Sequence, residues 1–120
     1  MAGGVQFVTR RIEPDILVVR LVGSLIPGSE AHALESLIQS LMDHEKKVIF
    51  DLGGIERIDS TGIQFLMQSF FTLRQAGGGL RLAGPSRITR LFTFLRLDSL
   101  GSIYPTVASA AADFEVTKGT

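Results

Sequence analysis

Apolar and polar residues alternate over residues 5–9, as they do in a strand that buries one face. Residues 16–22 are almost wholly apolar apart from Arg20, which predicts a strand that is buried more deeply. Glu13-Pro14-Asp15 lies between these segments and is a turn signal. Because this link is so short, the two strands are expected to form an antiparallel hairpin.

Four segments carry apolar residues at the spacing of one helical face. The first begins after an N-cap at Ser29. The second covers residues 61–75 and ends before the glycines at 77–79, which suit the position just past a helix. The third follows a turn at 84–86, and the fourth starts at 105–106. The apolar faces are Leu34, Leu37, Ile38 and Leu41; Ile63, Leu66, Met67, Phe70 and Phe71; Ile88, Leu91, Phe92 and Leu95; and Val107, Ala110, Ala111 and Phe114.

Three further apolar segments predict strands, at 47–52, 80–83 and 103–104. Gly53-Gly54 is expected to open a loop after the first of them. Strands that alternate with helices after a hairpin imply right-handed crossovers and parallel pairing. The predicted fold class is therefore α/β, with a mixed, mostly parallel sheet of about five strands, an N-terminal β-hairpin edge and about four helices. Residues 116–120 are expected to form a frayed tail.

Charge and composition narrow the class of protein. Lys plus Arg equals Asp plus Glu at 12 each, so the chain lacks the basic excess of a nucleic-acid binder. The absence of cysteine excludes disulfides and thiolate catalysis. With 45% apolar and 20% charged residues, positions 1–120 are expected to form a single domain. Neither a secretory signal nor an apolar run of bilayer length is seen, which predicts a cytoplasmic protein without direct membrane insertion.

The most informative chemistry lies in Asp59-Ser60-Thr61-Gly62, where an apolar strand gives way to a helix. Hydroxyls in the opening turn of a helix meet exposed backbone N–H groups and the positive end of the helix dipole. A phosphate placed there would be held by the same groups. The four residues by themselves leave two interpretations, of which a helix cap is the commoner and a phosphorylation switch is the other.

Other residues give weaker signals for catalysis. Asp51 stands where a receiver domain has its phosphorylated aspartate, but the accompanying acidic pair and lysine are missing. It is interpreted as a strand-end residue that orders the loop Asp59-Ser60-Thr61-Gly62, called the signature loop below. His32 and His44 are too far apart for metal ligation at i, i+4, and no Gly-x-Ser-x-Gly elbow exists. We therefore expect no enzyme activity, no metal and no cofactor.

Phe65 lies off the predicted apolar face of the second helix and close to Ser60. With Phe94, Leu95 and Leu97 it is a candidate for a partly exposed apolar surface. Two interpretations remain equally open for Phe65: packing against a neighbouring helix, or contact with a partner.

Several passages together resemble the STAS domain, the fold of bacterial anti-sigma-factor antagonists. The resemblance covers nearly the whole chain, which implies a domain core over about 5–114. The order and spacing of the passages make it fairly specific. The passages are VVRLVGSL at 18–25, in which Gly23 opens a Gly-x-Leu; VIFDL at 48–52, followed by IDSTGI at 58–63; GGGLRL at 77–82; and ITRLF at 88–92.

The resemblance implies that Ser60, directly after the signature aspartate, is phosphorylated by a partner kinase, with Thr61 as a second acceptor. That partner would be an anti-sigma-factor serine kinase with a histidine-kinase-like ATP fold. The unphosphorylated antagonist would bind the kinase and free a sigma factor, and a PP2C-type phosphatase would reset the switch. Where the family often has an aspartate near this serine, the chain has Ile26, which is a possible partner contact together with Phe65.

Three alternative functions remain. STAS domains also serve as adaptor subunits of membrane lipid or anion transport systems, because one fold hosts many functions. A sensor that binds a small ligand or nucleotide is a second alternative. A hydrolase that uses Ser60 is the third.

Overall fold

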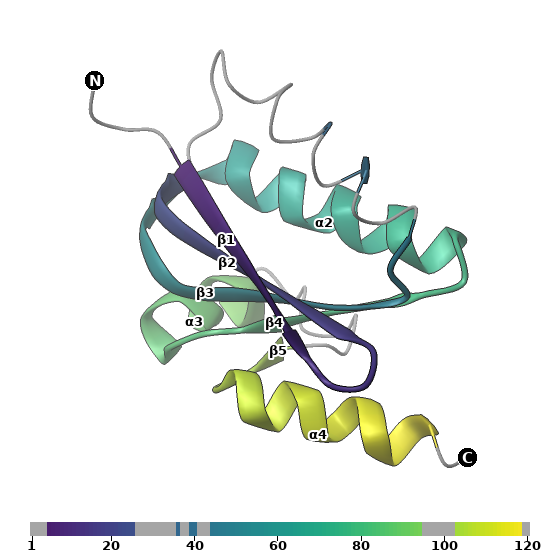
Figure 1. Ribbon diagram of the computed structural model, residues 1–120. Helices are drawn as coiled ribbons and strands as arrows, with labels where there is room; N and C mark the ends of the chain where they lie inside the picture. The colour runs from purple at the N-terminus through teal and green to yellow at the C-terminus, as the bar shows by residue number, and fades with distance from the viewer. Residues whose placement is uncertain (1–4, 26–35, 37–38, 41–43, 95–102, 119–120) are drawn as a thin grey trace.

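The computed structural model describes residues 5–25, 36, 39–40, 44–94 and 103–118, which form a five-stranded sheet with helices on both faces (Figure 1). The strands lie in the order β1-β2-β3-β4-β5. β1 and β2 are antiparallel and every later pair is parallel. The strands are β1 (Val5–Ile12), β2 (Ile16–Leu25), β3 (Lys47–Ile58), β4 (Gly79–Ala83) and β5 (Ile103–Tyr104), and the helices are α2 (Ser60–Gln75), α3 (Ser86–Phe94) and α4 (Val107–Lys118).

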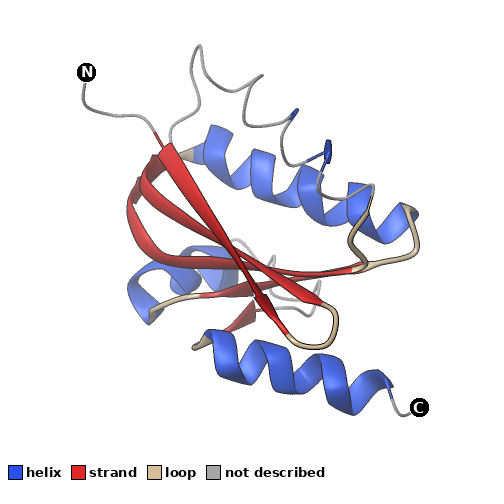
Figure 2. Cartoon of the chain, viewed as in Figure 1, coloured by secondary structure: helices blue, strands red, loops and turns tan. Residues whose placement is uncertain are grey.

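The sheet separates two apolar cores, as Figure 2 shows for α2 and α4 on its opposite sides. Successive residues of a strand point to opposite faces, so Val48 and Phe50 join the larger core while Ile49 joins the smaller one. α2 and α3 pack on the larger core, for example through Leu66 and Phe92, which are fully buried. This two-sided burial explains why β3 has few polar residues in its first half.

The predicted fold class is confirmed, with an N-terminal hairpin and a mostly parallel sheet of five strands. The helix count differs: the described residues contain three helices of the about four expected. The helix expected after Ser29 falls mainly outside the described residues, among which Ser36, Gln39 and Ser40 are helical. The frayed tail is wrong for residues 116–118, because α4 continues to Lys118 and no glycine or proline interrupts it before that point.

The predicted end of the third strand is also wrong. β3 does not stop before Gly53-Gly54 but runs on to Ile58, beside a β2 that extends to Leu25. A Cβ on Gly54 would lie 2.9 Å from the carbonyl oxygen of Leu21, so glycine here permits close approach to β2. The pairing of β2 with β3 shifts register twice in this region. The glycines therefore accommodate irregular pairing and do not end the strand.

Candidate functional site

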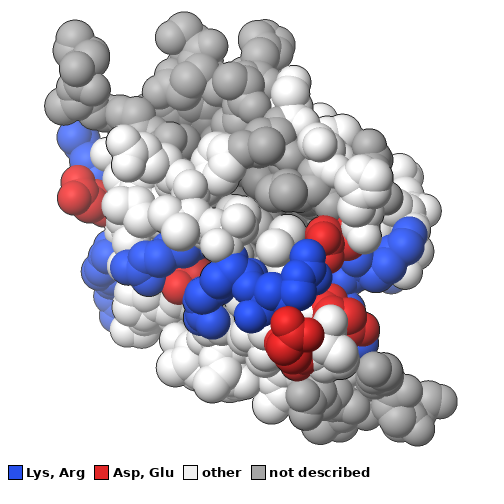
Figure 3. Space-filling model, viewed as in Figure 1, with Lys and Arg blue, Asp and Glu red and all other residues white. Residues whose placement is uncertain are grey.

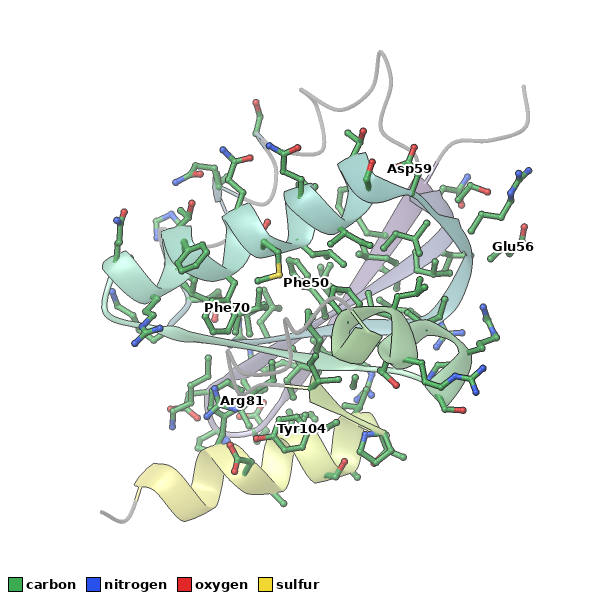
Figure 4. All side chains as sticks on the ribbon, turned by 180° about the vertical axis from the view of Figure 1, so that it is seen from behind. Phe50, Glu56, Asp59, Phe70, Arg81 and Tyr104 are labelled. Carbon is green, nitrogen blue, oxygen red and sulfur yellow. The ribbon has the colours of Figure 1, made fainter. Side chains whose placement is uncertain are left out.

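The corner between β3 and α2 is built around Asp59, which lies in extended conformation between the two elements. Its Oδ1 accepts a hydrogen bond of 2.9 Å from the backbone N–H of Gly62, and its carbonyl oxygen accepts one of 3.0 Å from Ile63. Asp59 is thus the N-cap of α2, and it accepts from one of the backbone N–H groups that have no partner within the first turn of a helix. Figure 4 shows Asp59 at this end of the helix.

Because Asp59 makes the cap hydrogen bond, the hydroxyls of the next two residues, Ser60 and Thr61, are not needed for it. Ser60 and Thr61 are both exposed, whereas Gly62 is buried against the core. No side-chain hydrogen bond joins Ser60 or Thr61 to another residue in the described part of the chain. The first turn of α2 contains no acidic residue of its own, and the carboxylate at the positive end of the helix dipole is that of the N-cap Asp59. The corner therefore presents solvent-facing hydroxyls next to a capped helix start.

Charged side chains gather elsewhere, in a band of mixed sign that crosses the strands (Figure 3). Two ion pairs join the strands to neighbouring segments, Arg11 to Glu45 at 2.8 Å and Lys47 to Asp15 at 3.0 Å. The paired Arg11 guanidinium holds the pKa of the Glu45 carboxyl below its usual range. These groups neutralise one another, so they form a surface of paired charges.

The two supporting residues of the predicted site lie within strands. Asp51 is not at the carboxyl end of its strand, because β3 continues to Ile58; that expected position is wrong. Its Oδ2 accepts from Arg20 at 3.0 Å and its Oδ1 accepts from the N–H of Gly53 at 2.9 Å, so its hydrogen bonds run to the strands and not to the signature loop. Gly23 has a φ of +112°, which favours glycine, and it pairs with Ile55 in β3.

The structure decides between the two interpretations of Phe65 and corrects the position expected for Phe71. Phe65 is only 6% exposed and belongs to the larger core, so it is not accessible to a partner. Phe71, expected on the buried apolar face, is 48% exposed. The possible contact Ile26 lies outside the described residues, as do Leu95, Leu97 and the side chain of Phe94.

A second polar cluster lies beneath α4, on the other face of the sheet, and sequence patterns gave no sign of it. Arg81 donates from Nε to Asp113 at 2.9 Å, and its guanidinium carbon lies 4.2 Å from the centroid of the Phe114 ring. A hydrogen bond from the Tyr104 hydroxyl holds the pKa of the Asp113 carboxyl below its usual value, and burial raises the pKa of Tyr104. Figure 4 shows Arg81 and Tyr104 on the side of the sheet that faces α4.

A pocket of about 330 Å³ opens next to this cluster, at the end of the sheet where β3 and β4 begin. Its basic side chains are already engaged: Lys46 donates to the carbonyl oxygen of Ala76 at 2.6 Å, and Lys47 and Arg81 form ion pairs. Its lining residues are Lys46, Lys47, Gly77, Gly78, Gly79, Arg81 and Phe114.

The described residues also lack two features that would have pointed to other functions. Across 5–25, 44–94 and 103–118, His, Asp and Glu side chains do not gather in groups of three that would hold a metal ion. No helix in these same parts of the chain has the length and apolar character needed to cross a bilayer.

Comparisons with known proteins agree with this fold. The model of the STAS domain family matches residues 8–110. No curated protein sequence matches the chain.

Solved structures with similar folds include two that are described as anti-sigma factor antagonists, one of them as putative, and one that is described as a cell fate determinant. An anti-sigma factor antagonist from Mycobacterium paratuberculosis is 21% identical, with a TM-score of 0.80 over 94% of this chain and 97% of that one. A putative anti-sigma factor antagonist from Thermotoga maritima is 22% identical, with a TM-score of 0.73 over 89% and 92%. The Bacillus cell fate determinant SpoIIAA in its phosphorylated form is 19% identical, with a TM-score of 0.68 over 91% and 99%.

These identities show a shared fold, and the family match covers most of the chain, including the signature corner at Asp59 and Ser60. The capped start of α2 and all of the parallel strands lie inside the matched region, together with most of the hairpin. The chain belongs to the STAS domain family.

Proposed function

We propose that this chain is an anti-sigma-factor antagonist, a protein-binding switch that sequesters an anti-sigma-factor kinase and is released when Ser60 is phosphorylated. One observation carries the proposal: Asp59 caps α2 by itself, so the neighbouring Ser60 hydroxyl is exposed at the helix start. The chain acts as the substrate of its partner and not as an enzyme. Thr61, also exposed, is the second candidate acceptor.

The fold should tolerate the modification. A phosphate on Ser60 adds about −1.5 to −2 charges at neutral pH. It would lie at the positive end of the α2 dipole, where the Asp59 carboxylate is already engaged by the N–H of Gly62. Since the cap hydrogen bond belongs to Asp59, the Ser60 hydroxyl can be esterified without breaking it.

The bound partner should not tolerate the same modification. A phosphate buried in an interface loses its hydration and repels any carboxylate that the partner places nearby. A loss of about 3 kcal/mol of binding free energy weakens an equilibrium roughly a hundredfold. The switch then acts through surface charge, and it requires no refolding of the chain.

The solved relatives support the choice of partner. Two structures of similar fold are described as anti-sigma factor antagonists, one of them as putative, and a third is a phosphorylated form of SpoIIAA. The resemblance to the STAS antagonists further implies that the partner is a serine kinase with a histidine-kinase-like ATP fold and that a PP2C-type phosphatase restores the unmodified state.

Incubation with an anti-sigma-factor kinase and ATP, followed by intact-mass measurement, tests the acceptor. We expect one phosphate on the wild type and none on Ser60→Ala. Ser86→Ala is the matched control, because Ser86 is another exposed serine at the start of a helix. Undiminished phosphorylation of Ser60→Ala would remove Ser60 from the role, and loss only in Thr61→Ala would transfer the role to Thr61.

Calorimetric titration of the same kinase tests the switch. Ser60→Asp is expected to bind at least tenfold more weakly than the wild type, a difference of about 1.4 kcal/mol or more, while its circular dichroism spectrum stays that of the folded protein. Equal affinities of the two proteins would refute control by charge.

A further inference from the structure

The solvent-facing side of α2 carries almost no charge. Across the 16 residues of the helix, Arg74 is the single charged one. Six exposed, uncharged residues form what we call the α2 stripe: Ser60, Thr61, Gln64, Gln68, Phe71 and Gln75. From Thr61 onward their spacing alternates between three and four positions, which places them on one side of a helix.

A face of this composition differs from an ordinary protein surface. Charged residues make up about 25–35% of a typical soluble surface. The centres of protein–protein interfaces, by contrast, are depleted of charged residues and enriched in aromatic ones. The α2 stripe combines an exposed phenylalanine with uncharged side chains, so its charge pattern suits a partner surface that is itself uncharged.

The Phe71 ring is partly exposed and is supported from one side by a neighbouring ring. Its side chain is 48% exposed, and its ring meets the ring of Phe70 edge to face, with centroids 5.8 Å apart and planes at 86°. Phe70 is buried in the larger core, and Figure 4 shows it on the sheet side of α2. A ring supported in this way loses less conformational entropy when a partner encloses it.

The α2 stripe is continuous with the phosphoacceptor. Ser60 and Phe71 lie three turns apart, about 16 Å along the axis, and are offset by only roughly 20° around it, given the geometry of an α-helix. A partner that covers Ser60 and follows the helix therefore reaches Phe71 without crossing a charged residue of α2. Arg74 comes after Phe71 in the helix, beyond this path.

We propose that the α2 stripe is a second part of the docking surface for the protein that recognises Ser60, and that this protein offers an uncharged surface with an apolar pocket for Phe71. The inference rests on the proposed function. It assigns distinct tasks to the two ends of α2: Ser60 makes binding sensitive to phosphate, while Phe71 supplies affinity in both states. Because the ends are well separated, their contributions should be additive.

Calorimetric titrations of an anti-sigma-factor kinase into four proteins test this division. Phe71→Ala and Gln68→Lys should each bind about tenfold more weakly than the wild type, as the loss of an interface anchor or the burial of an unpaired charge does. Val8→Ala is the matched control, because Val8 is an exposed apolar side chain, 62% exposed, that lies on β1 instead of α2. Thermal melts of all four should coincide within a few degrees, so that folding is not the cause.

Combination with Ser60→Asp separates the two proposals. Phe71→Ala should weaken wild-type and Ser60→Asp proteins by the same factor, so the Ser60→Asp effect keeps its size. Unchanged affinity of Phe71→Ala, with a normal effect of Ser60→Asp, would overturn the α2 stripe and leave the proposed function standing. Absence of both kinase binding and Ser60 phosphorylation would overturn the proposed function and the α2 stripe together.

Sedimentation velocity tests whether the α2 stripe binds a second copy of this chain instead. A wild-type dimer that Phe71→Ala converts to monomer would assign the stripe to that second copy and overturn its assignment to the kinase.

Discussion

The corner at Ser60 and the cluster beneath α4 both contain polar side chains, but they use them in opposite ways. Beneath α4, Arg81 engages Asp113 and the Phe114 ring, and Tyr104 engages the same carboxylate. At the corner, Asp59 makes the structural contact and Ser60 makes none with described side chains. The polar side chains beneath α4 bind one another and stabilise the fold, whereas at the corner the Ser60 hydroxyl faces the solvent.

The largest expected effect lies in the α4 cluster. Phe114→Ala should lower the free energy of unfolding by about 3–4 kcal/mol, because it empties a buried site and removes the surface on which Arg81 stacks. Urea denaturation measures the change. Phe71→Ala is the matched control and should cost only about 1 kcal/mol, since that ring is half exposed and packs on the ring of Phe70. If both variants lost the same free energy of unfolding, the contrast between the buried Phe114 and the partly exposed Phe71 would be contradicted.

A smaller effect is expected at the corner. Asp59→Ala removes the N-cap of α2 and should cost about 1 kcal/mol of folding stability, while Asp59→Asn should keep most of it. Ser60→Ala, at the adjacent exposed position, should change stability by less than about 0.5 kcal/mol. Chemical denaturation of the three variants compares them directly. A cost for Ser60→Ala as large as that for Asp59→Ala would mean that the serine shares the cap.

The smallest effect concerns pH. The pKa of Asp113 is held below its usual 3.8 by hydrogen bonding from Tyr104 and by Arg81. A folded pKa below the unfolded one means that the stabilisation is present above the usual value and is lost as the pH falls through the folded one. Because the pair is partly exposed, the loss should stay below about 1 kcal/mol.

Urea titrations between about pH 5 and pH 2.5 should therefore show a shallower decline for Asp113→Asn than for the wild type. The difference between the two proteins is the quantity to follow, because Glu45 has a lowered pKa as well and contributes to both curves. Parallel declines would show that the Asp113 hydrogen bonds add nothing to stability.

Sequence patterns predicted the order of the elements well, because both the hairpin turn and the strand–helix alternation are local signals. They failed where packing decides between equivalent local patterns. The apolar residues of α2 spread over more than one side, so periodicity assigned Phe71 to the core, where it is not, and left Phe65 undecided, although it is buried. Glycine at positions 53 and 54 signalled a loop, and only the neighbouring backbone of β2 shows why the strand continues.

The candidate site was predictable in part for the same reason. Asp59 and Ser60 follow each other in sequence, so a strand-to-helix corner could be expected there from periodicity alone. Which of the two would cap α2 depends on the backbone at the corner, where Asp59 is extended and Ser60 is already helical. The prediction that Asp51 ends its strand was wrong because β3 continues beyond the point where the apolar pattern weakens.

The longer β3 also has a consequence for solubility. Its pairing with β4 ends at Asp51, so the part that leads to Ser60 is hydrogen-bonded along one side by β2. An open strand side invites another chain to add a strand, which is a route to aggregation. Arg87 on α3 donates from Nη2 to the carbonyl oxygen of Ile55 at 2.8 Å, and so occupies an acceptor that an incoming strand would need. Strand addition is thereby hindered along the segment that leads to Ser60.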